Sequence, residues 1–172
     1  MHKTTVVIPN YNGMKYLQDC LSSLKAQEHN FDIIVVDNGS KDGSCSFIRE
    51  QFPEVSIFQF EENTGFCKAV NAGIEAADTE YVILLNNDTT VEKGFVSALE
   101  KVMDFYPKAF SAGAKMVDMK NPSVIDDAGD FYCALGWAFA RGCGKPADKY
   151  VKVKEVFSAC GGAAMYRQSI LD

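Results

Sequence analysis

Apolar residues in the first half of the chain alternate between short continuous runs and helical spacing. We expect strands at the four runs, over residues 4–9, 31–37, 55–60 and 81–86. The second and fourth runs are almost wholly apolar, which is typical of parallel strands covered on both faces. Elsewhere apolar residues recur at i, i+3, i+4 and i+7, which predicts helices. This spacing covers residues 17–24, 66–77 and 91–106, and more weakly 43–51.

The order of these elements predicts an α/β fold. Strand and helix alternate through four repeats, and right-handed crossovers turn such a chain into a doubly wound, mostly parallel sheet with helices on both faces. The second half is patterned differently. We expect a strand over 109–118, irregular structure over 119–155, and a strand over 156–166 that Gly161 and Gly162 interrupt. No repeat or linker divides the 172 residues, so we expect a single domain.

Each strand of the first half ends in a group of polar residues. The four groups occupy residues 9–13, 37–40, 61–65 and 86–89. The carboxyl ends of parallel strands share one edge of the sheet, where open α/β folds bind ligands. Turns and helix caps use the same residue types, so each group alone is compatible with a purely structural role. Because all four fall at the same edge, we expect a binding site.

Composition excludes some functions and indicates a compartment. The net charge of −6 makes general nucleic-acid binding a poor hypothesis. No apolar run is long enough to span a bilayer, and the first ten residues lack the pattern of a signal peptide. None of the six cysteines forms a C-x-x-C pair. Cys20 and Cys67 fall on apolar helix stripes, so we interpret them as reduced core residues of a cytosolic protein.

The residues at this edge favour a nucleotide as the ligand. Both G-x-G-x-x-G and the P-loop motif are absent, which argues against nicotinamide enzymes and NTPases. Tyr11 could stack on a base, and Asp37 could accept hydrogen bonds from a pyrimidine edge. Gly65 opens the third helix, whose N-terminus could face a phosphate, and Lys68 follows one turn later.

Asp88 is the candidate metal ligand. A diphosphate bound to an acidic protein favours a divalent cation, and Mg²⁺ or Mn²⁺ uses one or two protein carboxylates together with phosphate oxygens and water. Asn86 or Asn87 could assist directly or through water. The alternative is that Asp88 caps the fourth helix.

Several motifs together resemble the family 2 glycosyltransferases with the GT-A fold. They are "VVIPNYNG", "IIVVDNGSKDGS", "ENTGFCKAVNAGI" and "YVILLNNDT", followed by "GAKMVD", "DDAGD", "RGCGKP" and "SACGGAAMYR". Each motif alone is weak, but their order and spacing along almost the whole chain are specific. The nearest likeness is to a bacterial subgroup of rhamnosyltransferase-like enzymes of cell-surface polysaccharide synthesis.

This resemblance implies a reaction and its partners. The family moves a sugar, typically with inversion, from a nucleotide-diphosphate-sugar to an acceptor hydroxyl. Here it implies a hexosyltransferase with a donor of UDP or dTDP type, Mg²⁺ or Mn²⁺ as cofactor, and a saccharide or lipid-linked acceptor. It also implies a cytoplasmic protein that works at the inner face of the membrane through peripheral association.

The resemblance also assigns site residues by position. Nucleoside-binding positions correspond to Pro9, Asn10, Tyr11 and Asp37, and donor-approaching positions to Lys68 and Asn71. The D-x-D motif of the family corresponds to Asn86, Asn87 and Asp88, of which Asp88 binds the metal that bridges the phosphates. Gly161 and Gly162 correspond to a glycine-rich turn beside the sugar.

The catalytic base is the largest departure from the family pattern. The family carries it in an acidic pair beyond the glycine-rich strand, and the sequence stops at Asp172. We therefore expect residues 1–106 to form the nucleotide-binding half and 107–172 an incomplete sugar and acceptor half. We expect Asp126, Asp127 and Asp130 to line the sugar or acceptor side without acting as the base. The chain should then bind donor but transfer sugar poorly.

The sequence leaves two alternative functions open, and it allows two roles for one group of aromatic residues. A sugar nucleotidyltransferase would need a glycine-rich basic loop after the first strand, where "PNYNGMKY" offers only Gly13 and Lys15. A non-catalytic sugar-nucleotide binding module is the other alternative. The aromatic residues Phe131, Tyr132, Trp137 and Phe139 could stack on an acceptor sugar, but we expect them to form a local core under a long loop.

Overall fold

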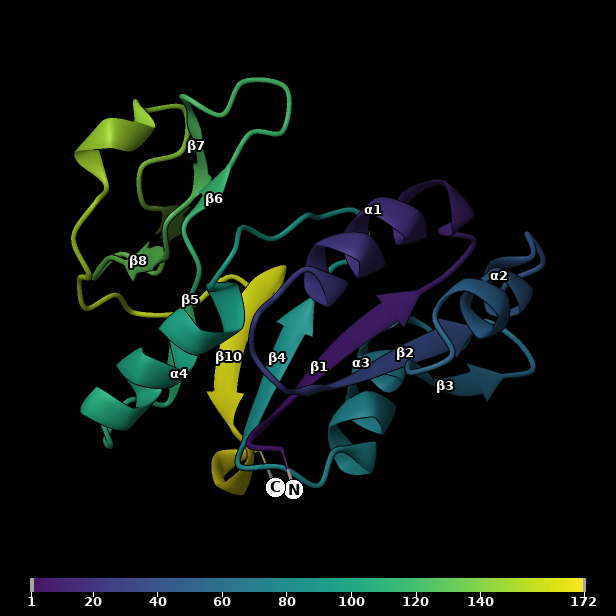
Figure 1. The fold of residues 1–172 in the computed structure, drawn as a ribbon. Coiled ribbons are helices and arrows are strands. Elements are labelled where there is room, and N and C mark those ends of the chain that lie inside the picture. The colour runs from purple at the N-terminus through teal and green to yellow at the C-terminus, as the bar shows by residue number, and fades with distance from the viewer. Residues whose placement is uncertain (1, 172) are drawn as a thin grey trace.

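The computed structural model describes residues 2–171 (Figure 1). Strand and helix alternate through residue 105, and shorter strands follow. The first elements are β1 (Thr4–Asn10), α1 (Met14–Lys25), β2 (Asp32–Asn38), α2 (Ser44–Gln51), β3 (Ser56–Phe60), α3 (Phe66–Ala76), β4 (Tyr81–Leu85) and α4 (Phe95–Phe105). The later ones are β5 (Ser111–Gly113), β6 (Met116–Val117), β7 (Ile125–Asp127), β8 (Asp130–Tyr132), β9 (Ala138–Ala140) and β10 (Ala163–Arg167), with 3-10 turns η1 (Ala147–Lys149) and η2 (Gln168–Ile170).

The main sheet confirms the predicted fold class. Its six strands run in the order β3-β2-β1-β4-β10-β5. The pairs β3-β2, β2-β1 and β1-β4 are parallel, whereas β10 runs antiparallel to both β4 and β5. Both halves of the sequence therefore contribute strands to one sheet. Figure 1 shows the parallel strands pointing toward one edge and β10 pointing back.

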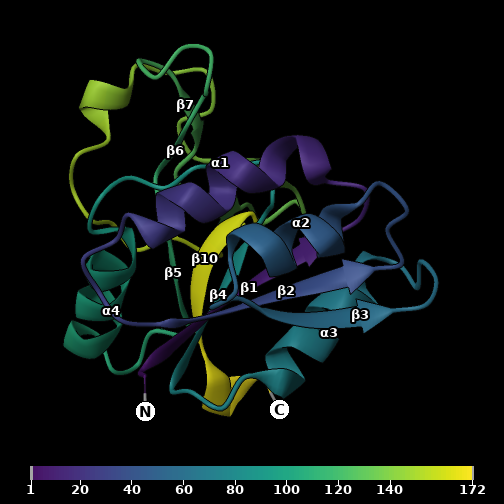
Figure 2. The same cartoon turned by 45° about the vertical axis from the view of Figure 1, so that its right-hand side comes forward.

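Alternating side chains divide the core into two layers. Val6 and Ile8 of β1 pack with apolar residues of α1, α2 and α4 on one face of the sheet. Val7, one residue between them, packs with α3 on the other face. Figure 2 shows α1 and α2 on one side of the sheet and α3 on the other. This arrangement follows from the two-residue period of a strand and explains the nearly continuous apolar runs.

Gly73 lets α3 lie close to the sheet, and its replacement tests that contact. A Cβ at this position would lie 2.3 Å from Cγ1 of Val7 and 2.9 Å from Cγ2 of Val36, both in the core. Gly73→Ala is expected to lower the free energy of unfolding by about 1–3 kcal/mol through overpacking, although alanine favours the helix. Urea unfolding followed by circular dichroism measures this, with Glu75→Ala on the exposed side of α3 as control. Equal stability of wild type and Gly73→Ala would contradict the close packing.

The second half corrects three sequence-based predictions. The strand expected over 109–118 is two short strands in different sheets, β5 in the main sheet and β6 paired with β7. The strand expected over 156–166 begins only at Ala163, because the backbone turns at 160–163, where Ala163 N–H donates to the Cys160 carbonyl. Residues 119–155, expected to be irregular, contain β7, β8 and β9, too short for a periodic signal.

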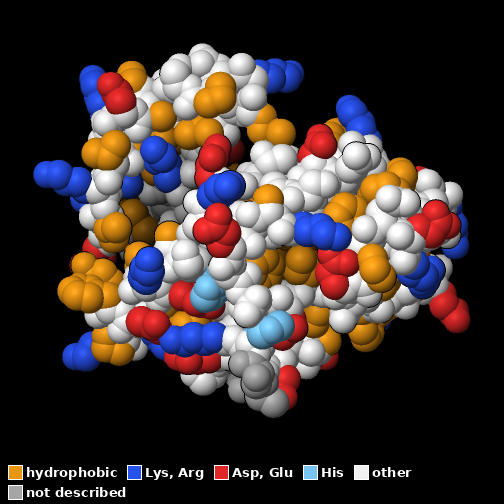
Figure 3. All heavy atoms as spheres, viewed as in Figure 1, with side chains coloured by type: hydrophobic (Ala, Val, Ile, Leu, Met, Phe, Trp, Pro, Cys, Tyr) orange, Lys and Arg blue, Asp and Glu red, His pale blue; other side chains and the backbone are white. Residues whose placement is uncertain are grey.

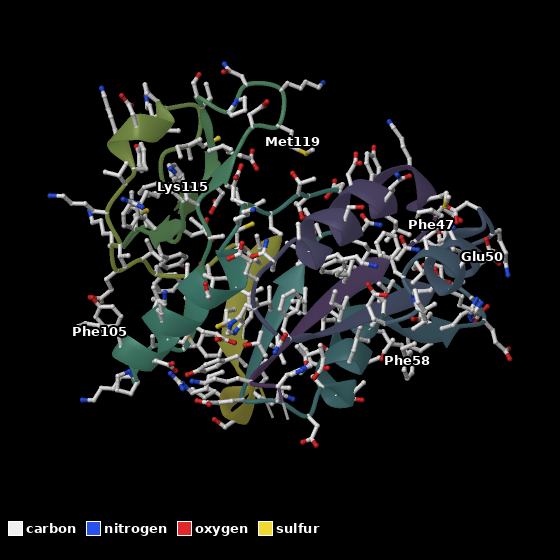
Figure 4. All side chains as sticks on the ribbon, in the orientation of Figure 1. Phe47, Glu50, Phe58, Phe105, Lys115 and Met119 are labelled. Carbon is white, nitrogen blue, oxygen red and sulfur yellow. The ribbon has the colours of Figure 1, made fainter. Side chains whose placement is uncertain are left out.

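Residues 116–158, which we call the side lobe, rise beside the carboxyl edge of the parallel strands (Figures 1 and 2). Figure 4 places Lys115 and Met119 on this side of the molecule, away from Phe47 on α2 and Phe58 on β3. Within the lobe, a backbone bridge between Asp130 and Ser158 ties β8 to the segment that leads back to the main sheet. The structure shows no helix, within residues 2–171, that is long and apolar enough to cross a membrane.

Two helix predictions also need correction. The spacing over 91–106 predicts a helix from Val91, but α4 begins at Phe95 and Val91 packs against the core from the preceding loop. Cys20 is fully buried as expected, whereas Cys67 is exposed on α3. Among residues 2–171, the α3 side chains that pack against this face of the sheet include Ala69 and Ile74 but not Cys67, so the apolar stripe of α3 is narrower than the sequence suggests. All six cysteines are free thiols.

Candidate functional site

The polar strand ends meet at one edge of the sheet, as the sequence predicts. The parallel register pairs Asn10 at the end of β1 with Asp37 in β2. It also pairs Asn38 with Phe60, which places the loop after β3 next to the end of β2. β4 lies on the other side of β1 and leads into Asn86, Asn87 and Asp88.

Asn10 links three of these strand ends through hydrogen bonds. Its Nδ2 donates to Oδ1 of Asp37 over 2.9 Å and to Oγ of Ser40 over 3.2 Å. Its Oδ1 accepts from Nδ2 of Asn87 over 2.8 Å. Asn10 and Asp37 are buried, and Asn87 is half-buried. We call Asn10, Asp37 and Asn87 the edge network.

Asp37 is expected from the sequence to accept hydrogen bonds from a pyrimidine, but in the structure its carboxylate is not accessible to a ligand. Its side chain is fully buried, and Oδ2 accepts the Ser40 N–H over 3.0 Å while Oδ1 accepts from Asn10. In this conformation Asp37 holds Asn10 and the following turn in place. A direct contact with a pyrimidine would require the turn at 38–41 to move.

Gly13 is essential to the edge network, and the sequence pattern did not single it out. A Cβ here would lie 2.1 Å from Nδ2 of Asn87 and 2.2 Å from Oδ1 of Asn10, at the hydrogen bond between them. Only glycine allows the backbone before α1 to approach this closely. The sequence signal was its place in the polar group after the first strand, which did not distinguish it from a turn glycine.

A second group of hydrogen bonds fixes the loop after β3. Asn38 donates through Nδ2 to Oδ1 of Asn63 and to the Gly65 carbonyl, over 2.9 and 3.1 Å. Its Oδ1 accepts the Thr64 N–H over 2.8 Å. Asn38 was also missed as a site residue, although its position at a strand end was visible in the sequence. These bonds position Gly65, whose φ of 89° suits glycine at the start of α3.

Asp88 is exposed beside the edge network. It does not cap α4, because that helix begins at Phe95 and its N-cap residue is Gly94. The alternative hypothesis, that Asp88 caps the fourth helix, is therefore wrong. The turn that contains Asp88 is closed by Thr89, whose Oγ1 donates to the Asn86 carbonyl over 2.7 Å.

Asn86 connects the Asp88 turn to the glycine pair. The Asn86 N–H donates to the Gly162 carbonyl over 2.9 Å. A Cβ on the buried Gly162 would lie 3.3 Å from Nδ2 of Asn86 and 3.5 Å from Cε of Met116. Gly161, by contrast, is exposed, and a Cβ there would meet only the Tyr166 hydroxyl, at 4.0 Å. The structure thus brings the predicted glycine turn directly against the predicted metal-binding turn.

The donor set fits a cation that shares its shell with a ligand. Among residues 2–171, no group of three or more His, Cys, Asp or Glu side chains is arranged to hold a metal alone. Asp88 supplies one exposed carboxylate, with the Asn86 amide in the same turn. Mg²⁺ bound to phosphates typically uses one or two carboxylates and keeps several waters, so this small donor set suits such a cation.

A hollow lies at the ends of β2 and β3, and its lining does not include the remaining predicted residues, which are Lys68, Asn71, Tyr11 and Pro9. The hollow has a volume of about 390 Å³ and is lined by Gly39, Lys41, Gln59, Phe60 and Glu61. Nζ of Lys68 lies 5.6 Å from the Phe60 ring centroid. Lys68 and Asn71 are both exposed on α3. Tyr11 is 52% exposed and Pro9 half-buried at the end of β1.

Burial changes the acid–base properties of two thiols near the edge site and of one carboxyl group in the side lobe. It raises the pKa of Cys20 to about 12, with a smaller effect of the Asp88 charge. Burial also raises the pKa of Cys45 to about 11, aided by the charge of Asp37. Both thiols therefore stay protonated and unreactive at neutral pH. Burial likewise raises the pKa of Asp127, against the effect of the Gly129 N–H that it accepts over 2.7 Å.

The expected aromatic core in the side lobe is wrong. Trp137 is 71% exposed, and Tyr132 and Phe139 are each 54% exposed. Only Phe131 is partly covered. The β8 and β9 strands have three residues each, and neither core cluster of the described residues includes any of these rings. Sequence alone could not distinguish the two arrangements, because aromatic residues are frequent in both.

The fold and the edge site define an α/β protein of the GT-A type. The chain belongs to glycosyl transferase family 2, whose family model matches residues 5–172. Its relatives include the glycosyltransferase GlyA of Streptococcus pneumoniae, 33% identical over 115 residues. That match covers 64% of this chain and 16% of GlyA, so the chain spans a small part of this relative. The rhamnosyltransferase-like subgroup stays a prediction.

Solved structures with the same fold are more distant in sequence. The TarS fragment 1–349 of S. aureus, in complex with UDP-GlcNAc, superposes with a TM-score of 0.71 at 22% identity. That match covers 98% of this chain and 46% of the TarS chain. A mannosyltransferase of Pyrobaculum calidifontis, in complex with GDP-Man and Mn²⁺, gives a TM-score of 0.68 at 18% identity and covers 99% and 46%. At these identities the likeness shows the fold alone.

Proposed function

We propose that the chain binds the donor of an inverting glycosyltransferase that moves a hexose from a nucleotide-diphosphate-sugar to an acceptor hydroxyl. One observation carries the proposal: the buried Asn10 and Asp37 and the half-buried Asn87 join three strand ends next to the exposed Asp88. A buried carboxylate needs hydrogen-bond partners, and Asn10 and the Ser40 N–H supply them to Asp37. The network therefore orders the strand ends as a fixed surface on which a ligand can bind. Family membership and the nucleotide-sugars bound by the TarS and Pyrobaculum proteins support it.

The nucleoside is assigned to the ends of β1, β2 and β3. Tyr11 offers an exposed ring for stacking and directly follows Pro9 and Asn10 at the end of β1. The buried Asp37 holds Asn10 and the Ser40 backbone in place under this surface through hydrogen bonds. Lys68 and Asn71, exposed on the first turns of α3, approach the donor beside Gly65. We infer a donor of UDP or dTDP type from the family resemblance.

The diphosphate is assigned to the turn after β4. Asp88, with Asn86, would hold Mg²⁺ or Mn²⁺, and the Pyrobaculum complex with Mn²⁺ supports a divalent cation in this fold. Such a cation stabilises the negative charge of a leaving diphosphate. Asn87 is turned inward to Asn10 and therefore positions the turn. Gly161 and Gly162 leave backbone close to the sugar.

The residues of the side lobe do not supply an evident base. Inverting transfer requires a group that removes the proton of the acceptor hydroxyl as it attacks. Asp127 is 8% exposed and bonded to Gly129, and Asp130 accepts a hydrogen bond from Ser158 over 3.0 Å. Asp126 is exposed on the short strand β7. We propose that these three line the sugar or acceptor side and that the chain alone transfers sugar poorly or not at all.

The wider role follows from the subgroup resemblance. We propose cell-surface polysaccharide synthesis with a saccharide or lipid-linked acceptor. The reaction would take place in the cytoplasm, at the inner face of the membrane, with peripheral association of the protein.

Calorimetric titration of UDP and dTDP into the chain tests the donor site. With Mn²⁺ present we expect saturable binding of one of the two, weakened at least about tenfold by EDTA, because a diphosphate without a cation faces an acidic protein. ADP is the control nucleotide. Absence of binding for both UDP and dTDP in the presence of Mn²⁺ would contradict the proposal.

A further inference from the structure

A hollow in the side lobe combines cations with aromatic faces. It has a volume of about 440 Å³, within the range of about 300–1,000 Å³ usual for small-molecule sites. Its lining includes Arg141, Lys149 and Lys154 as well as Phe131, Phe139 and Tyr150. Figure 3 shows Lys and Arg side chains beside hydrophobic ones along the outer edge of the lobe.

The charge of this hollow contrasts with that of the whole chain. The chain carries 23 acidic against 17 basic residues, yet residues 141–154 contain five Lys or Arg and one Asp. The lining contains three cations and no carboxylate. Within the described chain, no salt bridge joins Arg141, Lys149 or Lys154 to an acidic side chain. Three cations held close without a counter-charge favour an anionic ligand.

Arg141 is held in place by its contacts, and Lys154 lies beside an aromatic ring. The Arg141 guanidinium lies 4.9 Å from the Tyr150 ring centroid and donates through Nη1 to the Ala128 carbonyl over 3.1 Å. Tyr150 in turn packs on Gly142, where a Cβ would lie 2.6 Å from its ring. Nζ of Lys154 lies 5.5 Å from the Phe131 ring centroid. A fixed guanidinium with free N–H groups suits phosphate oxygens.

The aromatic residues indicate what the anion is attached to. Phe131 and Phe139 lie with ring centroids 5.9 Å apart, and Phe139 is 54% exposed beside the cations. Inorganic phosphate would use only the cations. A sugar ring has an apolar C–H face that packs on such rings, while its hydroxyls stay in water. The combination fits a phosphate joined to a saccharide.

The hollow is connected to the edge site through a short length of chain. Phe131 follows Asp130, whose backbone pairs with Ser158. Four residues further, Gly162 accepts the Asn86 N–H at the proposed diphosphate turn. The hollow therefore belongs to a lobe fixed directly to the edge where the donor would bind.

We propose that this hollow binds the phosphate-bearing saccharide of an anionic acceptor. The phosphate would pair with Arg141, Lys149 and Lys154, and the sugar would pack on Phe139 and Phe131. The role as an acceptor site rests on the proposed function, whereas binding of the phosphosaccharide is measurable without it. A phosphate group of this kind can come from a polymer, a soluble sugar phosphate or a lipid-linked headgroup.

The test is titration of α-glucose 1-phosphate into the chain, followed by NMR of the backbone amides. We expect saturable shifts in residues 129–154, and at least about fivefold weaker binding of both glucose and inorganic phosphate. A Lys149→Gln, Lys154→Gln double variant should bind at least about fivefold more weakly. The control is Lys152→Gln, which removes one exposed cation of the same segment that is not part of the lining. Phe139→Ala should weaken glucose 1-phosphate but leave inorganic phosphate unchanged.

Further ligands distinguish the sources of the phosphate. Tighter binding of a short isoprenyl diphosphate glucose than of glucose 1-phosphate would indicate a lipid-linked acceptor, and equal binding would indicate a soluble or polymeric one. The proposal is overturned if inorganic phosphate binds as tightly as the sugar phosphate, if the double variant binds normally, or if only phosphatidylglycerol vesicles bind. If neither UDP nor dTDP binds while glucose 1-phosphate does, the donor proposal alone is contradicted. If a nucleotide binds and glucose 1-phosphate does not, the proposal for the side-lobe hollow alone is contradicted.

Discussion

Asn10→Asp is expected to destabilise the protein by about 3–5 kcal/mol at pH 7, because it places a second carboxylate against a buried one. The substitution keeps the shape of the side chain and the oxygen that accepts from Asn87. It replaces Nδ2, which donates to Asp37 over 2.9 Å, by an oxygen. Two carboxylates at this distance in a buried site cannot both ionise, so the pair would share one proton.

The pH dependence of this variant has a definite sign. The folded variant would hold a proton that the unfolded chain releases above the ordinary Asp pKa of about 3.9. The stability of the variant relative to wild type is therefore expected to be greatest near pH 4 and to fall as the pH rises toward 7. Urea unfolding at a series of pH values measures the difference.

A matched substitution separates the effect of a buried carboxylate from that of one more negative charge on the protein. Asn71→Asp makes the same chemical change at an exposed position of α3 and should change stability by less than about 0.5 kcal/mol. A pH-independent loss of stability in Asn10→Asp would show that it comes from the lost Nδ2 donor and not from repulsion between carboxylates. A stability equal to that of wild type at pH 7 would contradict the buried edge network.

Asp88→Ala is expected to abolish most of the metal-dependent part of nucleotide binding. In Mn²⁺ the dissociation constant for the nucleoside diphosphate should rise at least about tenfold, which is about 1.4 kcal/mol. In EDTA the variant and the wild type should bind equally, because the carboxylate acts through the cation. Calorimetric titration under both conditions measures the difference.

The structure indicates that Asp88→Ala should change nucleotide binding without changing the stability of the fold. Asp88 is exposed, and the N-cap of α4 is Gly94, so the free energy of unfolding should stay within about 0.5 kcal/mol of wild type. Asp78→Ala removes an exposed carboxylate before β4, at the opposite end of that strand, and is the control. If Asp88→Ala binds the nucleotide normally in Mn²⁺, the metal assignment is wrong.

The first half of the fold could be predicted because its signals are local. β1, β2, β3 and β4 are short apolar runs, and α1 and α3 repeat apolar residues at helical spacing. The second half could not be predicted as well. β6 has two residues and β7, β8 and β9 have three each, too few for a period to emerge. Their formation depends on partners distant in sequence, such as Lys145, whose carbonyl accepts the Ile125 N–H.

Site residues divide in the same way. Asn10, Asp37 and Asn87 were identified because each lies at or just after the carboxyl end of a strand, and a parallel sheet must bring such positions to one edge. Gly13 and Asn38 lie at the same edge but were missed, since their importance depends on close approach and on partners from another loop. The exposed rings of the side lobe were assigned to a core because sequence does not report what covers them.

The sequence by itself determined the class of fold, the polar edge and the family, because all three depend on the order and spacing of residues along the chain. Only the tertiary structure decided how those residues act. It turned Asn87 inward and left Asp88 exposed, it buried Asp37 behind Asn10, and it gathered three cations around aromatic rings in the side lobe. The physical reason is that burial, hydrogen-bond partners and local charge depend on segments that meet only when the chain folds.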